Sequence, residues 1–222
     1  MYRVVLIGFT GLTLAGCALN SSAITSGFAD NPSSTASISK PKSQSSGLGG
    51  DPASRGSSAG GVKVASLDDK APKGTYETAP SGALSDRDYS QTQLNVEMAR
   101  DIINQYRKDN GLKPLKINAE LTAAAKAHSR DLAKWDRISH YGSDGSNPWD
   151  RVKRAGYKAR LAAENVGTGQ VTFDEVMKGW KNSPGHNKNL LLSDAEHMGL
   201  ALVYEQKTEF KSFWTLVVGS AM

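Results

Sequence analysis

The feature that most constrains the fold is the long stretch of residues 18–91, in which large apolar side chains are few and isolated. Ser, Gly, Ala, Pro, Lys and Asp dominate it instead. Such a composition cannot bury enough apolar surface to offset the entropy lost when the backbone is ordered. We therefore predict that residues 17–91 form a disordered tether and that residues 92–222 form the folded domain. An alternative is that residues 62–90 fold against that domain.

The first residues have the pattern of a secretory signal. Arg3 precedes an apolar run from Val4 to Leu14, which is too short to span a bilayer, because a spanning helix needs about 20 apolar residues. The run ends in Leu14-Ala15-Gly16-Cys17, which resembles a bacterial lipobox. By that resemblance residues 1–16 are a signal peptide and Cys17 carries lipid, the alternative being a plain signal with a chance cysteine.

Lipidation of Cys17, the single cysteine of the chain, has two consequences. No disulfide can form within the mature domain, so its stability must come from a packed core. The lipid would also anchor the protein to a bacterial membrane in the cell envelope. By the usual sorting rule, Ala18 in place of aspartate favours the outer membrane, if the organism has one.

Helical patterns begin at Thr92. Apolar residues recur at helical spacing, and capping residues stand at the ends of the apolar stripes. The predicted helices run from about Leu94 to Asn110, from Asn118 to Trp135, from Pro148 to Gly156, and from Thr172 to Pro184-Gly185.

Strand patterns occupy the rest of the domain. Leu161–Val166 is a predicted strand, and Met198–Tyr204 with Phe213–Gly219 form a predicted antiparallel hairpin. The order of elements indicates an α+β fold with helices packed on a small antiparallel sheet.

Candidate site residues stand in three short motifs near predicted element ends: Ser139-His140-Tyr141-Gly142, Ala163-Glu164-Asn165 and Ser183-Pro184-Gly185-His186. His140 lies in a polar loop, and a neutral imidazole there is a good metal ligand or proton acceptor. Pro184-Gly185 restricts the turn that carries His186. Glu164 interrupts an apolar strand, so it is either exposed or buried with a partner such as His140 or a cation. Each histidine can also be a simple loop or turn residue.

Ser183 adds a hydroxyl beside these groups. Serine, histidine and a carboxylate together evoke a nucleophilic triad, but no Gly-x-Ser-x-Gly elbow surrounds Ser183. If the protein is an enzyme, the candidate catalytic residues are Glu164, Ser183 and His140.

Other polar residues favour structural roles. Glu175 is the expected capping-box partner of Thr172, and His128 lies on an apolar helical stripe as a core histidine. His197 is expected in solvent, with a role as third metal ligand left open. Basic residues between 151 and 160 indicate a solvated helix face, with anionic lipid or wall polymers as alternatives; nucleic acid is not an expected partner of an exported protein.

Several motifs, in order, resemble the CAP superfamily of cysteine-rich secretory, antigen 5 and pathogenesis-related proteins. They are Ala127-His128-Ser129, Ser139-His140, Ala163-Glu164-Asn165, Trp180 with Ser183-Pro184-Gly185-His186-Asn187, and Met198-Gly199 with Phe213-Trp214. The match runs from about Leu94 to Gly219 and is closest to the cysteine-poor bacterial, SCP-like branch. The resemblance implies an α-β-α sandwich.

The resemblance also implies a cleft of two histidines and two acidic residues. His140 and His186 match the histidines, which would be metal ligands, and Glu164 matches the first acidic residue. Ser183 stands where the second acidic residue is expected, so one carboxylate is lost and cation binding should weaken.

Three functional hypotheses follow. The first is a lipid-anchored binding module of the cell envelope, whose His140–His186 cleft holds a divalent cation, with zinc as the candidate, and whose ligand is a lipid, a sterol or a cell-wall component. The second is an envelope hydrolase that acts on wall peptide, glycan or lipid ester through the same cleft. The third is a tethered structural protein of the envelope whose cleft is vestigial. The loss of the second carboxylate favours the first over the second.

Overall fold

The computed structural model describes residues 69–222, so the predicted signal peptide, Cys17 and tether residues 18–68 lie outside the described residues. The elements in chain order are β1 (Tyr76–Glu77), α1 (Val96–Asp109), β2 (Lys116–Ile117), α2 (Ala119–Trp135), β3 (Ile138–Ser139), α3 (Pro148–Arg154), β4 (Ala159–Thr168), α4 (Phe173–Asn182), α5 (Pro184–Leu190), β5 (His197–Tyr204) and β6 (Ser212–Ala221).

The main sheet has four strands in the order β2-β5-β6-β4. β4, β5 and β6 are antiparallel neighbours, whereas the short β2 runs parallel to β5. The predicted hairpin is therefore confirmed as β5–β6, and β4 forms one edge of this sheet.

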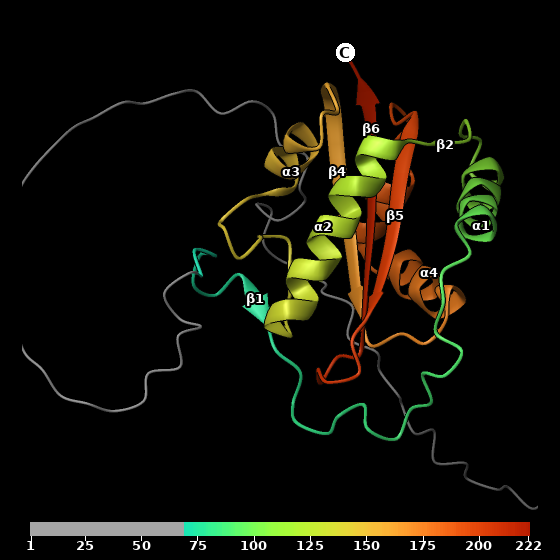
Figure 1. Ribbon diagram of the computed structural model, residues 1–222. Coiled ribbons are helices and arrows are strands. Elements are labelled where there is room, and N and C mark those ends of the chain that lie inside the picture. Colours follow the sequence, from blue (N-terminus) through green and yellow to red (C-terminus); the bar gives the residue numbers. More distant parts are fainter. Residues whose placement is uncertain (1–68) are drawn as a thin grey trace, which may run out of the picture.

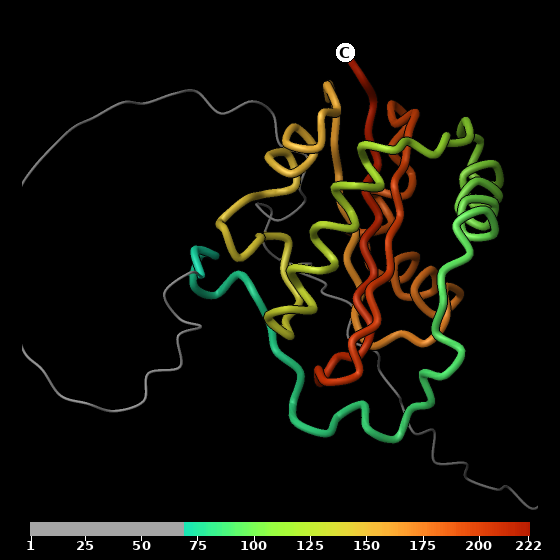
Figure 2. The backbone as a smooth tube through the Cα atoms, viewed as in Figure 1, coloured from blue at the N-terminus to red at the C-terminus, as the bar shows by residue number. Residues whose placement is uncertain are grey.

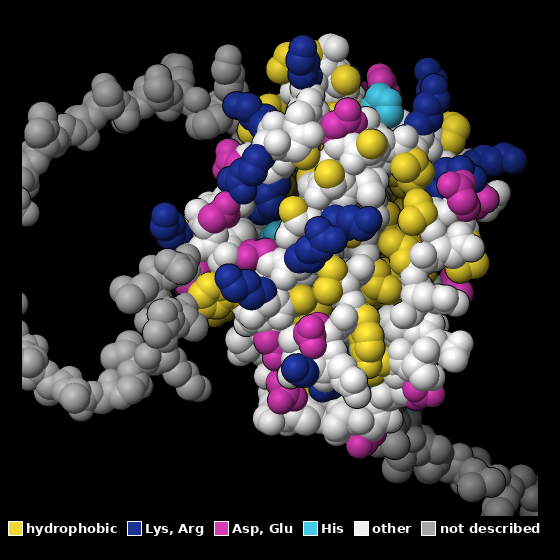
Figure 3. Space-filling model, viewed as in Figure 1, with side chains coloured by type: hydrophobic (Ala, Val, Ile, Leu, Met, Phe, Trp, Pro, Cys, Tyr) yellow, Lys and Arg dark blue, Asp and Glu magenta, His cyan; other side chains and the backbone are white. Residues whose placement is uncertain are grey.

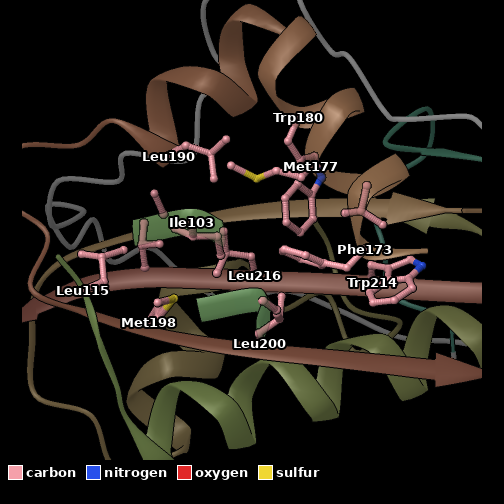
Figure 4. Packing of buried hydrophobic residues seen from close by; sticks show 14 of the residues in the cluster. Ile103, Leu115, Phe173, Met177, Trp180, Leu190, Met198, Leu200, Trp214 and Leu216 are labelled. Carbon is pink, nitrogen blue, oxygen red and sulfur yellow. The ribbon is translucent and has the colours of Figure 1, made fainter. Parts of the chain in front are cut away.

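Helices cover both faces of the sheet, as Figure 1 shows. On one face, residues of α1, α4 and α5 pack with sheet residues around Trp180 and Trp214 (Figure 4). On the other face, α2 and α3 pack through Leu121 and Val152 against Val217. Successive strand residues point to opposite faces, so each strand feeds both layers. The predicted α-β-α sandwich is confirmed.

The α2 layer lies very close to β5 at Gly199. A Cβ atom on Gly199 would lie 2.1 Å from the backbone carbon of Leu121 and 2.1 Å from the backbone nitrogen of Thr122. Only glycine allows this approach of a helix backbone to a strand. The contact fixes the position of the helix that carries His128.

Residues 69–91, the last part of the expected tether, pack on the domain. They pass below the sheet in Figure 2, from β1 beside β3 to the start of α1. Leu84 and Tyr89 are buried, and the Tyr89 hydroxyl donates to the Gly169 carbonyl oxygen at 2.8 Å. Arg87 forms an ion pair with Glu175 at 2.6 Å. This part follows the alternative in which residues 62–90 fold against the domain.

Two local expectations need correction. Pro184-Gly185 does not simply stop α4, because Pro184 also occupies the first turn of α5, a position that tolerates proline. Thr172 caps α4 as expected, but the Glu175 carboxylate accepts from the Val171 amide and from Arg87, so the second half of the capping box is absent from the described hydrogen bonds.

None of the helices within residues 69–222 is long and apolar enough to cross a membrane.

Candidate functional site

Glu164 stands at the centre of the site because of its place on β4. Within that strand Ala163 faces the layer of α1, α4 and α5, so the alternation of the strand turns Glu164 toward α2 and α3. Its side chain is 1% exposed. The prediction that this carboxylate is either exposed or buried with partners is resolved in favour of burial.

Both oxygens of the Glu164 carboxylate accept hydrogen bonds. His140 Nδ1 lies 3.0 Å from Oε1, and Arg151 Nη2 donates to Oε2 at 2.7 Å. Arg151 also donates to the His140 carbonyl oxygen at 3.0 Å. Arg151 therefore holds the backbone of His140 while it neutralises the carboxylate that orients the His140 ring.

His128 approaches the same carboxylate from α2. Its Nε2 lies 2.8 Å from the Ser139 carbonyl oxygen and 3.5 Å from Glu164 Oε1, and the side chain is fully buried. The expected core histidine is therefore confirmed as buried, but it also packs against the site.

His186 reaches the site from α5. Its ring centroid lies 6.3 Å from that of His140, with the two planes at 61°. Asn165, the next residue after Glu164, donates to the His186 carbonyl oxygen at 3.0 Å, and Asn189 donates to the Glu164 carbonyl oxygen at 3.1 Å. The Glu-Asn pair thus links the helix layer of α2 to that of α5.

Burial and neighbouring charges shift the pKa values of Glu164, His186 and His128. Burial raises the pKa of Glu164, but the charge of Arg151 and the nearby histidines outweigh it and hold that pKa well below its usual value. Burial, with His140 beside it, lowers the pKa of His186 to about 4. Burial and Arg151 lower the pKa of His128 to about 4. The carboxylate is therefore ionised, and His128 and His186 are neutral, at neutral pH.

The other candidates lie outside this hydrogen-bonded group. Ser183 joins α4 to α5, and no described hydrogen bond links it to His140 or His186. His197, left open as a third ligand, has its Nδ1 2.9 Å from the Tyr157 hydroxyl. Glu175 pairs with Arg87.

Arg151 also belongs to the site, although it stands among the basic residues of 151–160, for which the sequence predicts a solvated helix face. Its side chain is only 6% exposed. The available signal was position: Arg151 precedes the buried Val152 and lies one turn after Asn147, the cap of α3. A buried, charged Glu164 also required a cationic partner.

The arrangement offers imidazole nitrogens, whereas the Glu164 carboxylate is occupied by its partners. A carboxylate with both oxygens paired and a low pKa is a poor general base. His140 Nδ1 is directed to Glu164, which leaves Nε2 for another partner, and His186 Nδ1 is buried without a partner in the described chain. Among residues 69–222, no group of three or more His, Cys, Asp or Glu side chains is arranged to hold a metal ion.

Two relatives of the chain come from Bacillus subtilis. The chain is 36% identical over 115 residues to the uncharacterized protein YkwD of Bacillus subtilis and 30% identical over 121 residues to the uncharacterized membrane protein YlbC of the same organism. These matches cover 52% and 54% of this chain but 43% and 35% of the relatives. The chain therefore spans less than half the length of those two proteins.

Solved structures share the fold. An outer surface protein of Borrelia burgdorferi superposes with a TM-score of 0.53 at 21% identity, over 61% of this chain and 97% of that one. An extracellular protein of Bacillus anthracis that contains an SCP domain gives 0.50 at 22% identity, over 64% of this chain and 44% of that one. The model of the cysteine-rich secretory protein family, CAP, matches residues 100–218, more than half of the sequence. With this match and the α-β-α sandwich around His140, Glu164 and His186, the chain belongs to the CAP family.

Proposed function

We propose that the protein is a binding module of the bacterial cell envelope, anchored through a lipid on Cys17, whose CAP domain holds a divalent cation between His140 and His186. The observation that carries the metal site is the orientation of His140 by Glu164. Metal-binding histidines commonly donate their second ring nitrogen to a carboxylate, and Glu164 supplies that partner to His140 Nδ1 at 3.0 Å.

Zinc is the cation that fits these donors best. Neutral imidazole is a preferred zinc ligand, and His186, with its pKa lowered to about 4, is neutral under physiological conditions. A bound zinc would polarise an oxygen atom of a ligand. With Ser183 in place of an acidic residue, the protein supplies two nitrogens and no ionised oxygen to the ion, so binding should be weak.

The envelope location rests on the sequence and on the relatives. The Leu14-Ala15-Gly16-Cys17 pattern supports lipidation, and one relative is described as a membrane protein and one fold neighbour as an outer surface protein. A lipid, sterol or cell-wall component remains our expected ligand class for the envelope module.

Isothermal titration of the full chain with zinc tests the metal site. We expect binding that weakens at least tenfold in the His140→Ala/His186→Ala double variant. His197→Ala is the matched control, because His197 bonds Tyr157 rather than the site. Unchanged binding in the double variant, or an equal loss in the control, would remove the metal site from the proposal.

Metabolic labelling with a fatty-acid analogue tests the anchor. The label should appear on the wild-type chain and disappear in Cys17→Ser, which should also leave the membrane fraction. A labelled Cys17→Ser chain would contradict the lipid anchor.

A further inference from the structure

The exposed side of α2 presents positive charge between very small side chains. Lys126, Arg130 and Lys134 are exposed and follow one another at intervals of four residues. They therefore form one row along the helix, which we call the cationic row. Ala123 and Ala127 are exposed beside it. Because a methyl group projects little from the helix, these alanines leave the longer cationic side chains free to reach a flat partner.

The cationic row has no acidic partners in the folded domain. None of the ion pairs within residues 69–222 includes a member of the row. Nearby carboxylates are directed elsewhere: Asp131 accepts from the Ser143 amide at 2.7 Å, and Asp136 accepts from the Glu209 amide at 2.6 Å. The row therefore carries positive charge that the described chain does not pair.

Positive charge also dominates the wider surface formed by α2, α3 and the residues that follow them. Residues 119–160 include seven exposed Lys and Arg side chains and three exposed Asp and Glu side chains. Figure 3 shows Lys and Arg atoms spread over α2 and α3 on the face that it views. A surface with this excess attracts a negatively charged partner, and the attraction weakens as salt is added.

Aromatic side chains at the C-terminal end of the row favour a lipid surface over a dissolved polyanion. Lys134 Nζ lies 5.7 Å from the centre of the Trp135 ring, and the Arg137 guanidinium lies 4.8 Å from the centre of the Tyr76 ring. Tyr76 is 38% exposed and Trp135 is half-buried. Tyr and Trp are enriched at the headgroup level of membranes, because each has an apolar body and a polar tip.

The chain between Cys17 and the domain reaches the domain at this same end of α2. Arg137, two residues after α2 ends at Trp135, donates to the Asp69 carboxylate at 2.6 Å. Residues 18–68 connect this point to Cys17, the proposed lipid anchor. A membrane that holds the lipid is therefore tethered to the end of the cationic row, and a tether raises the effective concentration for a weak second contact.

We propose that the cationic row, together with Tyr76 and Trp135, docks the domain on a bilayer that contains anionic lipid. This goes beyond the lipid on Cys17, because the folded domain makes the contact and needs no acyl chain for it. It also uses none of the residues of the proposed metal site. The anchor supplies proximity, and the row sets which side of the domain faces the membrane. The anchor, the metal site and the docking surface can therefore fail separately.

Co-sedimentation with vesicles tests the docking surface in the absence of a lipid anchor. The protein is the chain from residue 17 with Cys17→Ser, which carries neither the apolar signal run nor an acyl chain. We expect binding to phosphatidylcholine vesicles that contain about 30% phosphatidylglycerol, and loss of this binding as NaCl rises from about 0.05 to 0.5 M. Vesicles of phosphatidylcholine alone should not bind the protein.

Removal of the row tests its part in this binding. The triple variant Lys126→Gln/Arg130→Gln/Lys134→Gln should bind the anionic vesicles at least about tenfold more weakly, because each cation near such a surface strengthens binding by about fivefold. Zinc binding by this variant should equal that of the wild type, so a loss of vesicle binding cannot be attributed to the metal site.

The matched control is Lys108→Gln/Lys178→Gln/Lys188→Gln, which removes the same charge from exposed lysines of α1, α4 and α5 on the other layer. It should weaken vesicle binding less than about twofold. Four results would overturn the proposal: no binding to anionic vesicles at low salt, equal binding to neutral and anionic vesicles, equal losses in the two triple variants, or binding of soluble poly(glycerol phosphate) as tight per phosphate as that of the vesicles. The last result would assign the row to a dissolved polyanion.

Discussion

Arg151 Nη2 donates to Glu164 Oε2 at 2.7 Å, and the two side chains are 6% and 1% exposed. This buried pair joins α3 to the edge strand β4 and fixes the carboxylate that orients His140. A buried ion pair is costly to break because one charge is then left without a partner.

Glu164→Gln should therefore lower the free energy of unfolding by about 3–5 kcal/mol, because it leaves Arg151 charged and buried. Glu175→Gln is the matched control: its ion pair with Arg87 has a carboxylate side chain that is 41% exposed, so we expect a loss of about 1 kcal/mol or less. Urea denaturation measures both. Equal losses in the two variants would contradict the structural role of the Arg151–Glu164 pair.

The close approach of α2 to β5 gives a second prediction. In Gly199→Ala the added methyl group would lie 2.1 Å from backbone atoms of Leu121 and Thr122, so the helix must move off the sheet. We expect the free energy of unfolding of Gly199→Ala to fall by about 3 kcal/mol or more, which is the upper end of the cost of overpacking a core.

Gly167→Ala is the control for that variant, since its nearest contact is the Gln170 side chain at 3.1 Å, which can move. Gly167→Ala should lower the free energy of unfolding clearly less than Gly199→Ala does, which thermal or urea denaturation can measure. A Gly199→Ala chain as stable as Gly167→Ala would show that α2 does not rest on β5 as described.

Stability should depend on pH between about 6.5 and 4. The pKa of His186 falls from 6.5 to about 4 on folding, and that of His128 does the same. In this window the unfolded chain binds more protons than the folded chain, so the stability present above pH 6.5 is lost as the pH falls toward 4. Denaturation midpoints at pH 7.5, 5.5 and 4.5 should decrease in that order.

His186→Gln should make that decrease shallower, because one of the two neutral histidines is removed. Equal stability of the wild-type chain at pH 7.5 and 4.5 would contradict the burial of neutral imidazoles.

Residues 69–78, which precede the part of the chain that matches the CAP family, should stabilise the loop that carries His140. β1 pairs with β3 through Tyr76 and Ser139, and the Ser139 hydroxyl donates to the Thr75 carbonyl oxygen at 2.6 Å. A chain that starts at residue 79 should therefore exchange the Tyr141 amide hydrogen faster than a chain that starts at residue 69. Its melting temperature should fall by at least about 2–4 °C, the effect of about 1 kcal/mol in a domain of this size. Identical exchange rates of the Tyr141 amide hydrogen in the two chains would show that the preceding residues do not stabilise the His140 loop.

Much of the fold could be predicted because its signals are local. Asn118 and Thr172 cap helices where the sequence places them, and the apolar runs of β5 and β6 form the expected hairpin. The place of Pro184 in a new helix could not be predicted, because proline is typical both of the residues after a helix end and of the first turn of the next helix. The packing of residues 69–91 was open as an alternative and could not be decided, because isolated apolar residues such as Leu84 become buried only through distant partners.

In the candidate site, too, some features could be predicted from the sequence and one could not. The family motifs identified His140, Glu164 and His186, which the fold brings together. The position of Arg151 beside Val152 is a local signal of burial, but its pairing with Glu164 depends on how α3 lies on β4, which is a tertiary contact.

The most direct test of the proposed cation site is an anomalous-diffraction map of crystals of the protein soaked with zinc. We expect one ion within about 2.0–2.1 Å of His140 Nε2 and of a nitrogen of His186, the usual zinc–nitrogen distance, and no such peak in crystals of His140→Ala/His186→Ala. A map in which zinc binds only elsewhere, or in which the cleft peak persists in the double variant, would contradict it.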